Sequence, residues 1–464
     1  MISLTMIRRL NPLISLGLLT VILHAVLLFV LIPKISGRVK AFYNQDRFTD
    51  GYDQLASNLA LGNGYRLYPD TARTLMREPG YPIFLAGLLL LFGSTFTAVK
   101  GANMCLAFAT AWLMTRLTGR LSNSRTLLIV PPLLFLFHPA TLVAESRGGV
   151  EILFTFFVIL FLLFLYTAIE RADWRYYALT GVILGLAVLV RSTPMLFPLL
   201  LLGYLLIFER WRTPALAIGR NVAVVVVAMF VVLSPWIIRN YGLTGRFVPT
   251  ASVLGVSAHA GEYICSHRAE DKPWFLLDRE AAQQRGNLAD ELGYRYKDVK
   301  DGYYQSFYST DDELNFSSYL AKKVFREYEK NPMLCAKCMG LNLFNFWFTG
   351  KSATSTAINV LVQLPYLILA VIGSVLCLKN KRFTTIGPLV LFILYVMAVH
   401  VPILAQARYS VPLVPLLSIL ASFVFVAKRK SVHSISAAVT LHGGDCACTP
   451  IAAVSLAGCG TEKP

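Results

Sequence analysis

The chain has 464 residues, of which 56% are hydrophobic and 15% charged, and its mean hydropathy is +0.58. This composition is too apolar for a set of soluble domains and is typical of a polytopic membrane protein. The formal net charge of +17 would suit a nucleic-acid-binding protein, so the placement of the basic residues decides between these two interpretations.

Ten apolar segments approach the roughly 20 residues that a helix needs to cross a bilayer. A further segment, 82–92, is too short to cross, and we expect it to lie at the membrane face or to dip into it. The predicted fold class is therefore all-α and polytopic, with about ten or more transmembrane helices. The ten segments are 13–32, 97–115, 127–143, 150–168, 176–192, 194–208, 221–238, 356–378, 384–402 and 409–427.

The basic residues gather in the short segments that lie inside if the N-terminus is cytoplasmic. These segments hold 16 Lys and Arg against three acidic residues, which accounts for +13 of the net charge. The long segment 241–350 is balanced, with 13 basic and 14 acidic residues. This positive-inside pattern places 34–80 and 241–350 outside the cytoplasm and both termini inside it. The charge therefore reports topology and anionic lipid contact, and it argues against a nucleic-acid partner.

This topology divides the chain into four parts and makes it a multi-pass protein of the plasma or inner membrane. Pro33 and Lys34 follow the first span without a small-residue cleavage pattern, so this span is predicted to remain as an anchor. The parts are a transmembrane module (1–240) whose outer loop (34–80) carries acidic residues, a small extracytoplasmic cap (241–350), the last transmembrane helices (351–430) and a cytoplasmic tail (431–464) that we expect to be disordered.

Eight scattered cysteines do not indicate a disulfide scaffold. Cys265, Cys335 and Cys338 fall on the outer side, where disulfides are allowed. The run CAKC (335–338) favours simple packing or one structural disulfide over a redox motif. The cysteines of the tail do not have the spacing of a metal site.

The run DGYDQLASNLALG places two acidic residues just outside the first span. If this run is helical from its start, Asp50 and Asp53 share one face. Tyr52, Leu55 and the residues that follow at helical spacing then form an apolar face that suits an amphipathic juxtamembrane helix. Asp50 is either the N-cap of this helix or a catalytic carboxylate, and the pattern alone does not separate the two.

Four arginines stand at the outer ends of apolar segments. Guanidinium groups gathered at one membrane face suit a phosphate or diphosphate. A single arginine there often only extends its charged group to the membrane–water interface. Glu145 and Glu151 flank the third and fourth spans at the same face, and Glu151 is expected to point into the outer cavity. His259 is a lone histidine of the cap, which favours a structural role. The arginines are Arg77, Arg191, Arg239 and Arg408.

These runs together resemble the membrane glycosyltransferases of the type-C fold, in the branch of the protein O-mannosyltransferases and aminoarabinose transferases, also classed as glycosyltransferase family 39. The resemblance spans about residues 45–420, and the order of its runs makes it specific. The matching runs are DGYDQLASNLALGNGY, REPGYPIFLAGLLLLFG, HPATLVAESRGGVEILF, GLAVLVRSTPMLFP, SPWIIRNYGLTGRFV and ARYSVPLVPLL.

The resemblance implies roles for these residues. Asp50 corresponds to the catalytic base, Glu151 to a second acidic position with Asp53 beside the base, and Arg77 with Tyr81 to the turn that contacts the lipid phosphate. The other arginines, Arg191, Arg239 and Arg408, correspond to basic positions with less defined donor-binding roles. Gly51 departs from the family, which has Glu after the base.

The same resemblance implies a lipid-linked donor and leaves the metal open. The zinc-ligating Glu of the aminoarabinose branch would fall near Met76, so Glu78 and His259 are only candidate ligands for a divalent metal. The predicted activity is inverting transfer of a sugar from a polyprenyl phosphate to an extracytoplasmic protein, lipid or polysaccharide, with Asp50 made more basic by partial burial and with the cap shaping the acceptor site. A transporter or flippase of lipid-linked glycans, a glycan ligase and a scaffold are the alternatives.

Overall fold

The computed structural model describes residues 12–32, 50–93, 96–210, 213–268, 272–299, 304–379 and 383–425. The tail 431–464 and the start of the first outer loop, 34–49, lie outside these residues, and so do their predictions.

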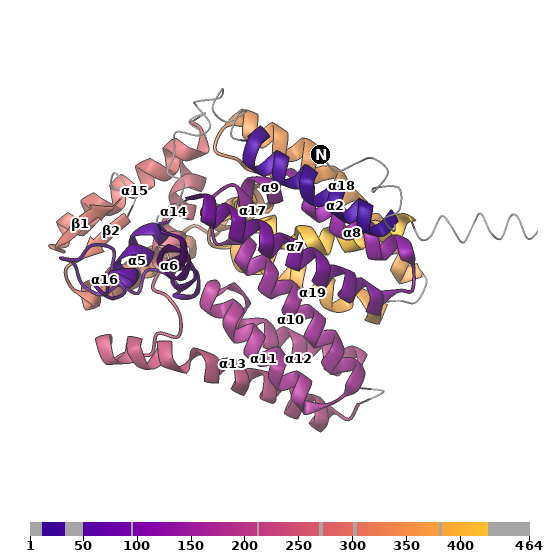
Figure 1. Cartoon of the computed structure of the whole chain (residues 1–464). Coiled ribbons are helices and arrows are strands. Elements are labelled where there is room, and N and C mark those ends of the chain that lie inside the picture. Colours follow the sequence, from indigo (N-terminus) through magenta and orange to yellow (C-terminus); the bar gives the residue numbers. More distant parts are fainter. Residues whose placement is uncertain are drawn as a thin grey trace, which may run out of the picture.

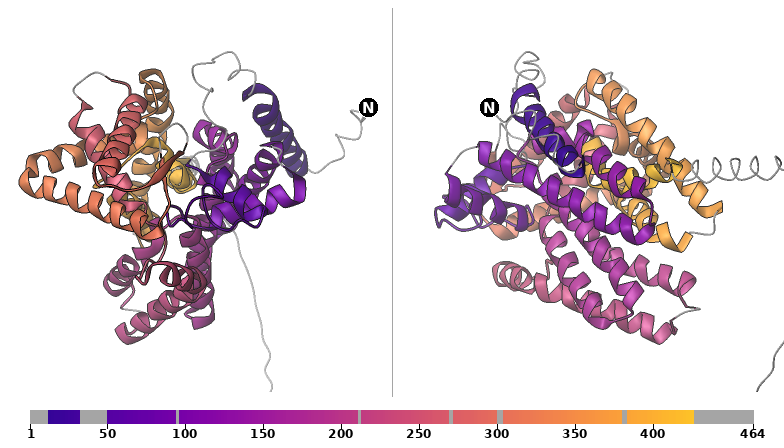
Figure 2. Two further views of the ribbon diagram at one scale, coloured as in Figure 1. Left: turned by 90° about the vertical axis from the view of Figure 1, so that its left-hand side faces the viewer. Right: turned by 45° about the vertical axis from the view of Figure 1, so that its right-hand side comes forward.

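Helices cover the described residues of all ten apolar segments, and α10 contacts α7, α11 and the last described helix (Figure 1). The turned views of Figure 2 show the same arrangement from two further sides. The helices over these segments are α2 (Pro12–Val26) with η1 (Leu27–Leu31), α7 (Phe96–Leu121), α8 (Arg125–Leu136) with α9 (Pro139–Glu145), α10 (Glu151–Arg171), α11 (Trp174–Val190), η2 (Thr193–Leu196) with α12 (Phe197–Phe208), α13 (Ala215–Thr244), α18 (Ala353–Lys379), α19 (Phe383–His400) and Ala407–Phe425, which begins as η4 (Ala407–Leu413).

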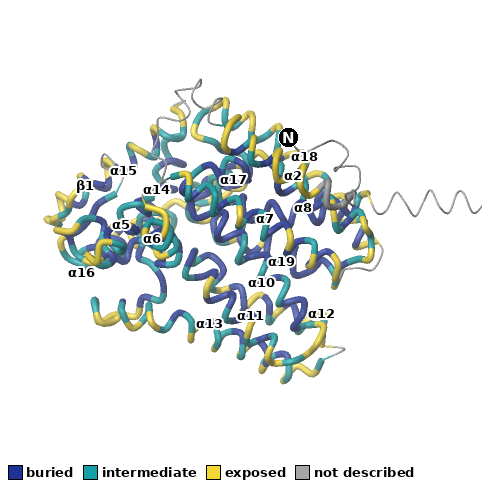
Figure 3. The backbone as a smooth tube through the Cα atoms, viewed as in Figure 1, coloured by how far each residue is buried: buried dark blue, intermediate teal, exposed yellow. Residues whose placement is uncertain are grey.

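Four of the described helices are long and apolar enough to cross a membrane by themselves: α10, α13, α18 and Ala407–Phe425. The pair α8 and α9 would be a fifth, but the two helices are bent by 55° relative to each other. The others over the predicted segments are shorter or less apolar. Large apolar residues are exposed on α12, α13 and α18, as expected of surfaces that face lipid. Figure 3 colours the backbone by how far each residue is buried. The all-α polytopic fold is confirmed.

The prediction of one continuous span over 127–143 is wrong. His138 has extended backbone angles, and its ring nitrogen Nδ1 accepts a hydrogen bond from the backbone N–H of Ala140 at 3.2 Å. Pro139 then begins α9, because proline suits the first turn of a helix but interrupts the bonding of a preceding one. The predicted third span is therefore broken before its last seven helical residues.

The described residues of the cap form four helices and one antiparallel hairpin. Its small core joins Ala289, Phe307, Phe316 and Leu320. In the hairpin, Tyr296 pairs with Phe307 and Val299 with Tyr304. The elements are α14 (Leu254–Ser266), α15 (Trp274–Glu291), β1 (Tyr296–Val299), β2 (Tyr304–Phe307), α16 (Thr310–Lys330) and α17 (Pro332–Phe348).

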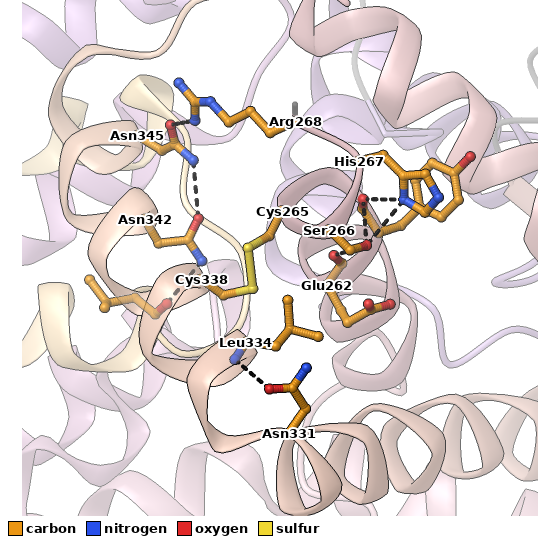
Figure 4. The surroundings of a disulfide bond; sticks show 12 residues. Glu262, Cys265, Ser266, His267, Arg268, Asn331, Leu334, Cys338, Asn342 and Asn345 are labelled. Carbon is orange, nitrogen blue, oxygen red and sulfur yellow. Dashed lines mark hydrogen bonds between the residues drawn. A yellow bond between two sulfur atoms is a disulfide. The ribbon is translucent and has the colours of Figure 1, made fainter. Parts of the chain in front are cut away.

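One disulfide ties the cap together. Cys265 of α14 is bonded to Cys338 of α17, with their Cα atoms 5.5 Å apart (Figure 4). Cys335 is free, so CAKC is not a redox pair and the interpretation as one structural disulfide is confirmed. A disulfide here agrees with a cap that lies on the oxidising side of the membrane.

Candidate functional site

The first outer loop contributes α5 (Tyr52–Ala60), whose apolar face is buried against α6 (Gly80–Phe92). The predicted amphipathic helix is present, but its apolar face packs inside the protein instead of lying on the membrane, and the helix begins two residues later than expected. Gly51 is the N-cap, and Asp50 precedes the helix with a φ of 65°. Asp50 therefore neither caps α5 nor shares a helical face with Asp53, which lies half-buried in the first turn.

Asp50 and Gly51 are two consecutive residues with positive φ. The φ of Gly51 is 77°, and a Cβ there would lie 3.0 Å from Cδ2 of Leu67. A side chain at this position would be strained in both respects. Positive φ is uncommon for Asp, and such strain concentrates at functional sites. The local backbone thus turns the Asp50 side chain away from its own helix.

The Asp50 carboxylate meets groups from three distant segments. Arg408 donates from Nη1 to Oδ2 at 3.0 Å and from Nη2 to Oδ1 at 3.4 Å. The Tyr304 hydroxyl donates to Oδ1 at 2.6 Å. Arg77 places Nη2 3.5 Å from Oδ1, and its Nε donates to the Asp50 carbonyl oxygen at 3.2 Å. The side chain of Asp50 is only 11% exposed in this setting.

The charges around Asp50 decide its pKa. Burial alone would raise it, but the charges of Arg408 and Arg77 and the hydrogen bonds from Tyr304 and Arg408 outweigh burial and lower the pKa well below its usual range. The expectation of a raised pKa is therefore wrong, because two cations accompany the burial. The carboxylate contributes its full stability above about pH 4, near the pKa of an unfolded Asp, and this contribution is lost as the pH falls through the lowered pKa.

The turn REPGYP holds Arg77 against the end of α11. The Glu78 carboxylate accepts a hydrogen bond from the backbone N–H of Ser192 at 2.9 Å. The Tyr65 hydroxyl lies 3.0 Å from the carbonyl oxygens of both Arg77 and Glu78. Gly80 passes so close to α11 that a Cβ on it would lie 2.8 Å from the Leu189 carbonyl oxygen. The turn is thus fixed by side-chain bonds and by a close backbone approach.

Replacing Gly80 with Ala tests this packing. The added methyl would meet backbone rather than a flexible side chain, so we expect a loss of about 1–3 kcal/mol in the free energy of unfolding. Thermal unfolding in detergent, compared with Gly87→Ala in the same helix, measures it. Gly87 has open space at its Cβ. Equal melting temperatures for the two variants would contradict the close approach.

Several other predicted residues gather beside this centre. Arg191 and Arg408 both lie over the ring of Tyr409, at 4.5 and 5.3 Å from its centroid. Tyr81 is fully buried with its ring edge-on to Tyr52 at 5.0 Å, and its hydroxyl has no hydrogen-bond partner among the described residues. Glu151 is 7% exposed at the start of α10 and interacts electrostatically with Arg408 and Tyr81.

Arg239 and Glu145 take part in different contacts. Arg239 donates to the Thr74 carbonyl oxygen at 3.0 Å and lies over the Trp236 ring at 4.4 Å, so it supports the turn before Arg77. Glu145 does not face an outer cavity: it is fully buried and lies 2.8 Å from Nε2 of His24 on α2. The bend between α8 and α9 turns this carboxylate inward.

The two candidate metal ligands have different surroundings. Glu78 holds Ser192, as described above. Burial and the neighbouring charges of Arg285 and Lys323 lower the pKa of the buried His259 to about 3, which keeps its ring neutral. Among the residues that the structure describes, no group of three His, Cys, Asp or Glu side chains is arranged to hold a metal ion.

Two residues of the centre were not predicted from the sequence. Tyr304 belongs to an aromatic run of the cap in which several tyrosines are equivalent by pattern. Asp278 of α15 is a second acid: burial raises its pKa, Arg285 and Arg408 oppose this, and the negative charge of Asp50 adds to it. Two carboxyl groups with opposite pKa shifts therefore interact at this centre.

Comparisons with known proteins agree with this architecture. Residues 76–238 match the model of the family described as dolichyl-phosphate-mannose-protein mannosyltransferase. None of the curated proteins compared with the chain matches it. The structure is similar to the archaeal oligosaccharyltransferase AglB from Archaeoglobus fulgidus in complex with an inhibitory peptide and a dolichol-phosphate, with a TM-score of 0.51 and 11% identity over 86% of this chain and 48% of that chain.

Two further structures complete the comparison. The apo form of the A. fulgidus oligosaccharyltransferase gives a TM-score of 0.53 and 15% identity over 93% of this chain and 52% of that chain. ArnT from Cupriavidus metallidurans bound to undecaprenyl phosphate gives a TM-score of 0.37 and 14% identity over 86% and 76% of the two chains. The chain spans about half the length of the oligosaccharyltransferase that it matches.

Proposed function

Because the chain has the fold of the type-C membrane glycosyltransferases and matches the dolichyl-phosphate-mannose-protein mannosyltransferase family over residues 76–238, we propose that it transfers a sugar from a polyprenyl-phosphate donor to an extracytoplasmic acceptor. The complex of AglB with a dolichol-phosphate supports a lipid-linked donor. The acceptor is a hydroxyl or another polar group of a protein, lipid or polysaccharide.

One observation carries this proposal: Arg77 and Arg408 converge on a single carboxylate of the first outer loop, that of Asp50. Guanidinium groups that hold a carboxylate also have the charge and the paired N–H donors to hold a phosphate. Arg191, which shares the ring of Tyr409 with Arg408, adds a third positive charge. We assign this arginine set to the donor phosphate.

Asp50 is the base in this proposal. The acceptor oxygen attacks the anomeric carbon while the bond from that carbon to the phosphate oxygen breaks. The phosphate leaves with the bonding electron pair, and its charge is stabilised by the arginines. The acceptor proton passes to Asp50. A single displacement of this kind inverts the anomeric centre.

Arg408 and Arg77 hold the pKa of Asp50 below its usual range. Both cations that lower it are the ones assigned to the phosphate, so an anionic donor would weaken their hold on the carboxylate. Donor binding would thereby make Asp50 more basic when the base is needed. The charge distribution and the cap disulfide support a site on the extracytoplasmic face of the membrane.

A donor panel tests the proposed activity. Purified protein in nanodiscs is incubated with radiolabelled polyprenyl-phosphate sugars and a membrane extract that supplies acceptors. We expect release of polyprenyl phosphate from at least one donor, and in Arg408→Gln a KM for that donor raised roughly tenfold, as for the loss of a charged hydrogen bond. Binding of every donor without cleavage, together with donor movement across a liposome membrane, would favour a transporter instead.

A further inference from the structure

We infer that Tyr304 is a positioning residue through which the cap orients the Asp50 carboxylate and the Arg77 guanidinium. The inference rests on the proposed function, because it concerns the same carboxylate. No feature of the sequence singles out Tyr304 from the neighbouring tyrosines of the cap.

One side chain of the cap contacts both groups. The Tyr304 hydroxyl donates to Oδ1 of Asp50 at 2.6 Å, and the guanidinium of Arg77 lies over the Tyr304 ring at 5.1 Å from its centroid. Arg77 also lies over the Tyr52 ring at 5.9 Å, so two tyrosines hold it from different segments. The ring fixes the cation and the hydroxyl fixes the anion.

The hairpin that carries Tyr304 is itself fixed to the first outer loop. Val299, the β1 partner of Tyr304, is fully buried in one cluster with Leu55, Leu67 and Met76. These contacts bring the end of the hairpin against the segment between α5 and Arg77. The position of the Tyr304 side chain is therefore set by the packing of the cap on this loop.

Hydrogen bonds between the same two segments reinforce this packing. The Tyr68 hydroxyl donates to the Asp298 carbonyl oxygen at 3.0 Å, and the backbone N–H of Ala72 donates to the Phe307 carbonyl oxygen at 3.0 Å. The first bond joins the loop to β1 and the second joins it to β2. Tyr304 thus contacts Asp50 from a hairpin of which both strands are bonded to the first outer loop.

The two oxygens of Asp50 are held differently, and this suggests which one receives the proton. Oδ1 accepts from Tyr304 and faces Arg77, whereas the shorter bond from Arg408 goes to Oδ2. When Arg408 turns to a donor phosphate, Tyr304 still occupies Oδ1. Oδ2 is then the oxygen available to the acceptor proton.

Several charged groups face this carboxylate besides Tyr304. They are Arg77 from the first loop, Arg408 from the last span, Asp278 from α15 and Lys351 from the segment before α18. Their charges act on Asp50 in wild type and in a Tyr304 variant alike. A difference in the protonation of Asp50 between the two proteins therefore reports the loss of the Tyr304 hydroxyl.

Carboxyl labelling tests the contact without any need for turnover. Asp50 is labelled with a water-soluble carbodiimide between pH 3 and 7 in wild type and in Tyr304→Phe, and the modified peptide is quantified by mass spectrometry. Only the protonated acid reacts. We expect about tenfold more labelling of Asp50 in Tyr304→Phe at a given acidic pH, since one pKa unit changes the protonated fraction tenfold. Tyr296→Phe is the matched control: Tyr296 lies in the same hairpin, but its hydroxyl donates to the Gly286 carbonyl oxygen and to Asp290 of α15 and does not contact Asp50.

Kinetics on the donor identified by the panel completes the test. In Tyr304→Phe we expect the kcat to fall roughly tenfold and the acid limb of its pH profile to shift upward, with the donor KM unchanged. Equal Asp50 labelling in all three proteins, or an unchanged acid limb and kcat, would overturn the role of Tyr304. If wild type cleaves no donor while Tyr304→Phe still raises labelling, the contact stands and the proposed function fails.

Discussion

Replacing Asp50 with Asn is expected to lower the kcat for sugar transfer by roughly 10²–10⁴-fold, the contribution of a general base. Asn has nearly the same size and tolerates a positive φ, so the backbone at φ 65° should be kept. The amide cannot take the acceptor proton. Single-turnover release of polyprenyl phosphate at saturating donor measures the chemical step directly.

Asp70→Asn is the control for this experiment. Asp70 lies in the same loop and forms a surface ion pair with Lys297 at 3.1 Å, which should contribute little to stability or activity. We expect its kcat to remain that of wild type. A kcat of Asp50→Asn within a few-fold of wild type would show that another group, for which Asp278 is the next candidate, takes the proton.

Replacing His24 with Ala is expected to have the largest effect on stability. His24 and Glu145 are both fully buried and lie 2.8 Å apart, joining α2 to α9. Most of the other described side chains of α2 face outward, including Leu19 at 61% exposed. Loss of the imidazole leaves a buried carboxyl group without its partner, which costs roughly 3 kcal/mol.

Thermal unfolding in detergent measures this loss, and a double replacement separates its causes. His24→Leu combined with Glu145→Leu removes both polar groups, so it should be more stable than His24→Ala. Equal melting temperatures of wild type and His24→Ala would contradict a role for this pair in docking α2. A double variant less stable than the single one would show that the lost partner is not the cause.

The positions of the membrane helices were predictable because a long apolar run has few alternatives to a membrane or core helix. The break in the third span was not, because Pro131 and Pro132 lie inside α8 while the chain bends only at His138. A proline in a sequence is compatible with a continuous helix, as at Pro131 and Pro132, or with the start of a new helix, as at Pro139. Only tertiary packing decides where the broken span turns. The same packing decides whether Glu145 is buried.

The candidate site was predictable in part. Asp50 and Arg77 both belong to the first outer loop, and the motifs of that loop suggested that they act together, although 27 residues separate them. Arg239 and Arg408 are alike in pattern, each at the outer end of an apolar run, yet one supports a turn and the other binds Asp50. Tyr304 reaches the site through the register of the hairpin and the packing of the cap, neither of which has a local signature. The lowered pKa of Asp50 depends on those distant partners.

Arg77 and Arg408, which both contact Asp50, are proposed to form the site of the donor phosphate. Titration of purified wild type and Asp50→Asn with a polyprenyl phosphate, by intrinsic fluorescence in nanodiscs, tests this assignment. Removing the competing carboxylate frees both guanidinium groups, so Asp50→Asn should bind the lipid phosphate about tenfold more tightly than wild type, and Arg408→Gln more weakly. Identical affinities in all three proteins would place the phosphate elsewhere and contradict the account.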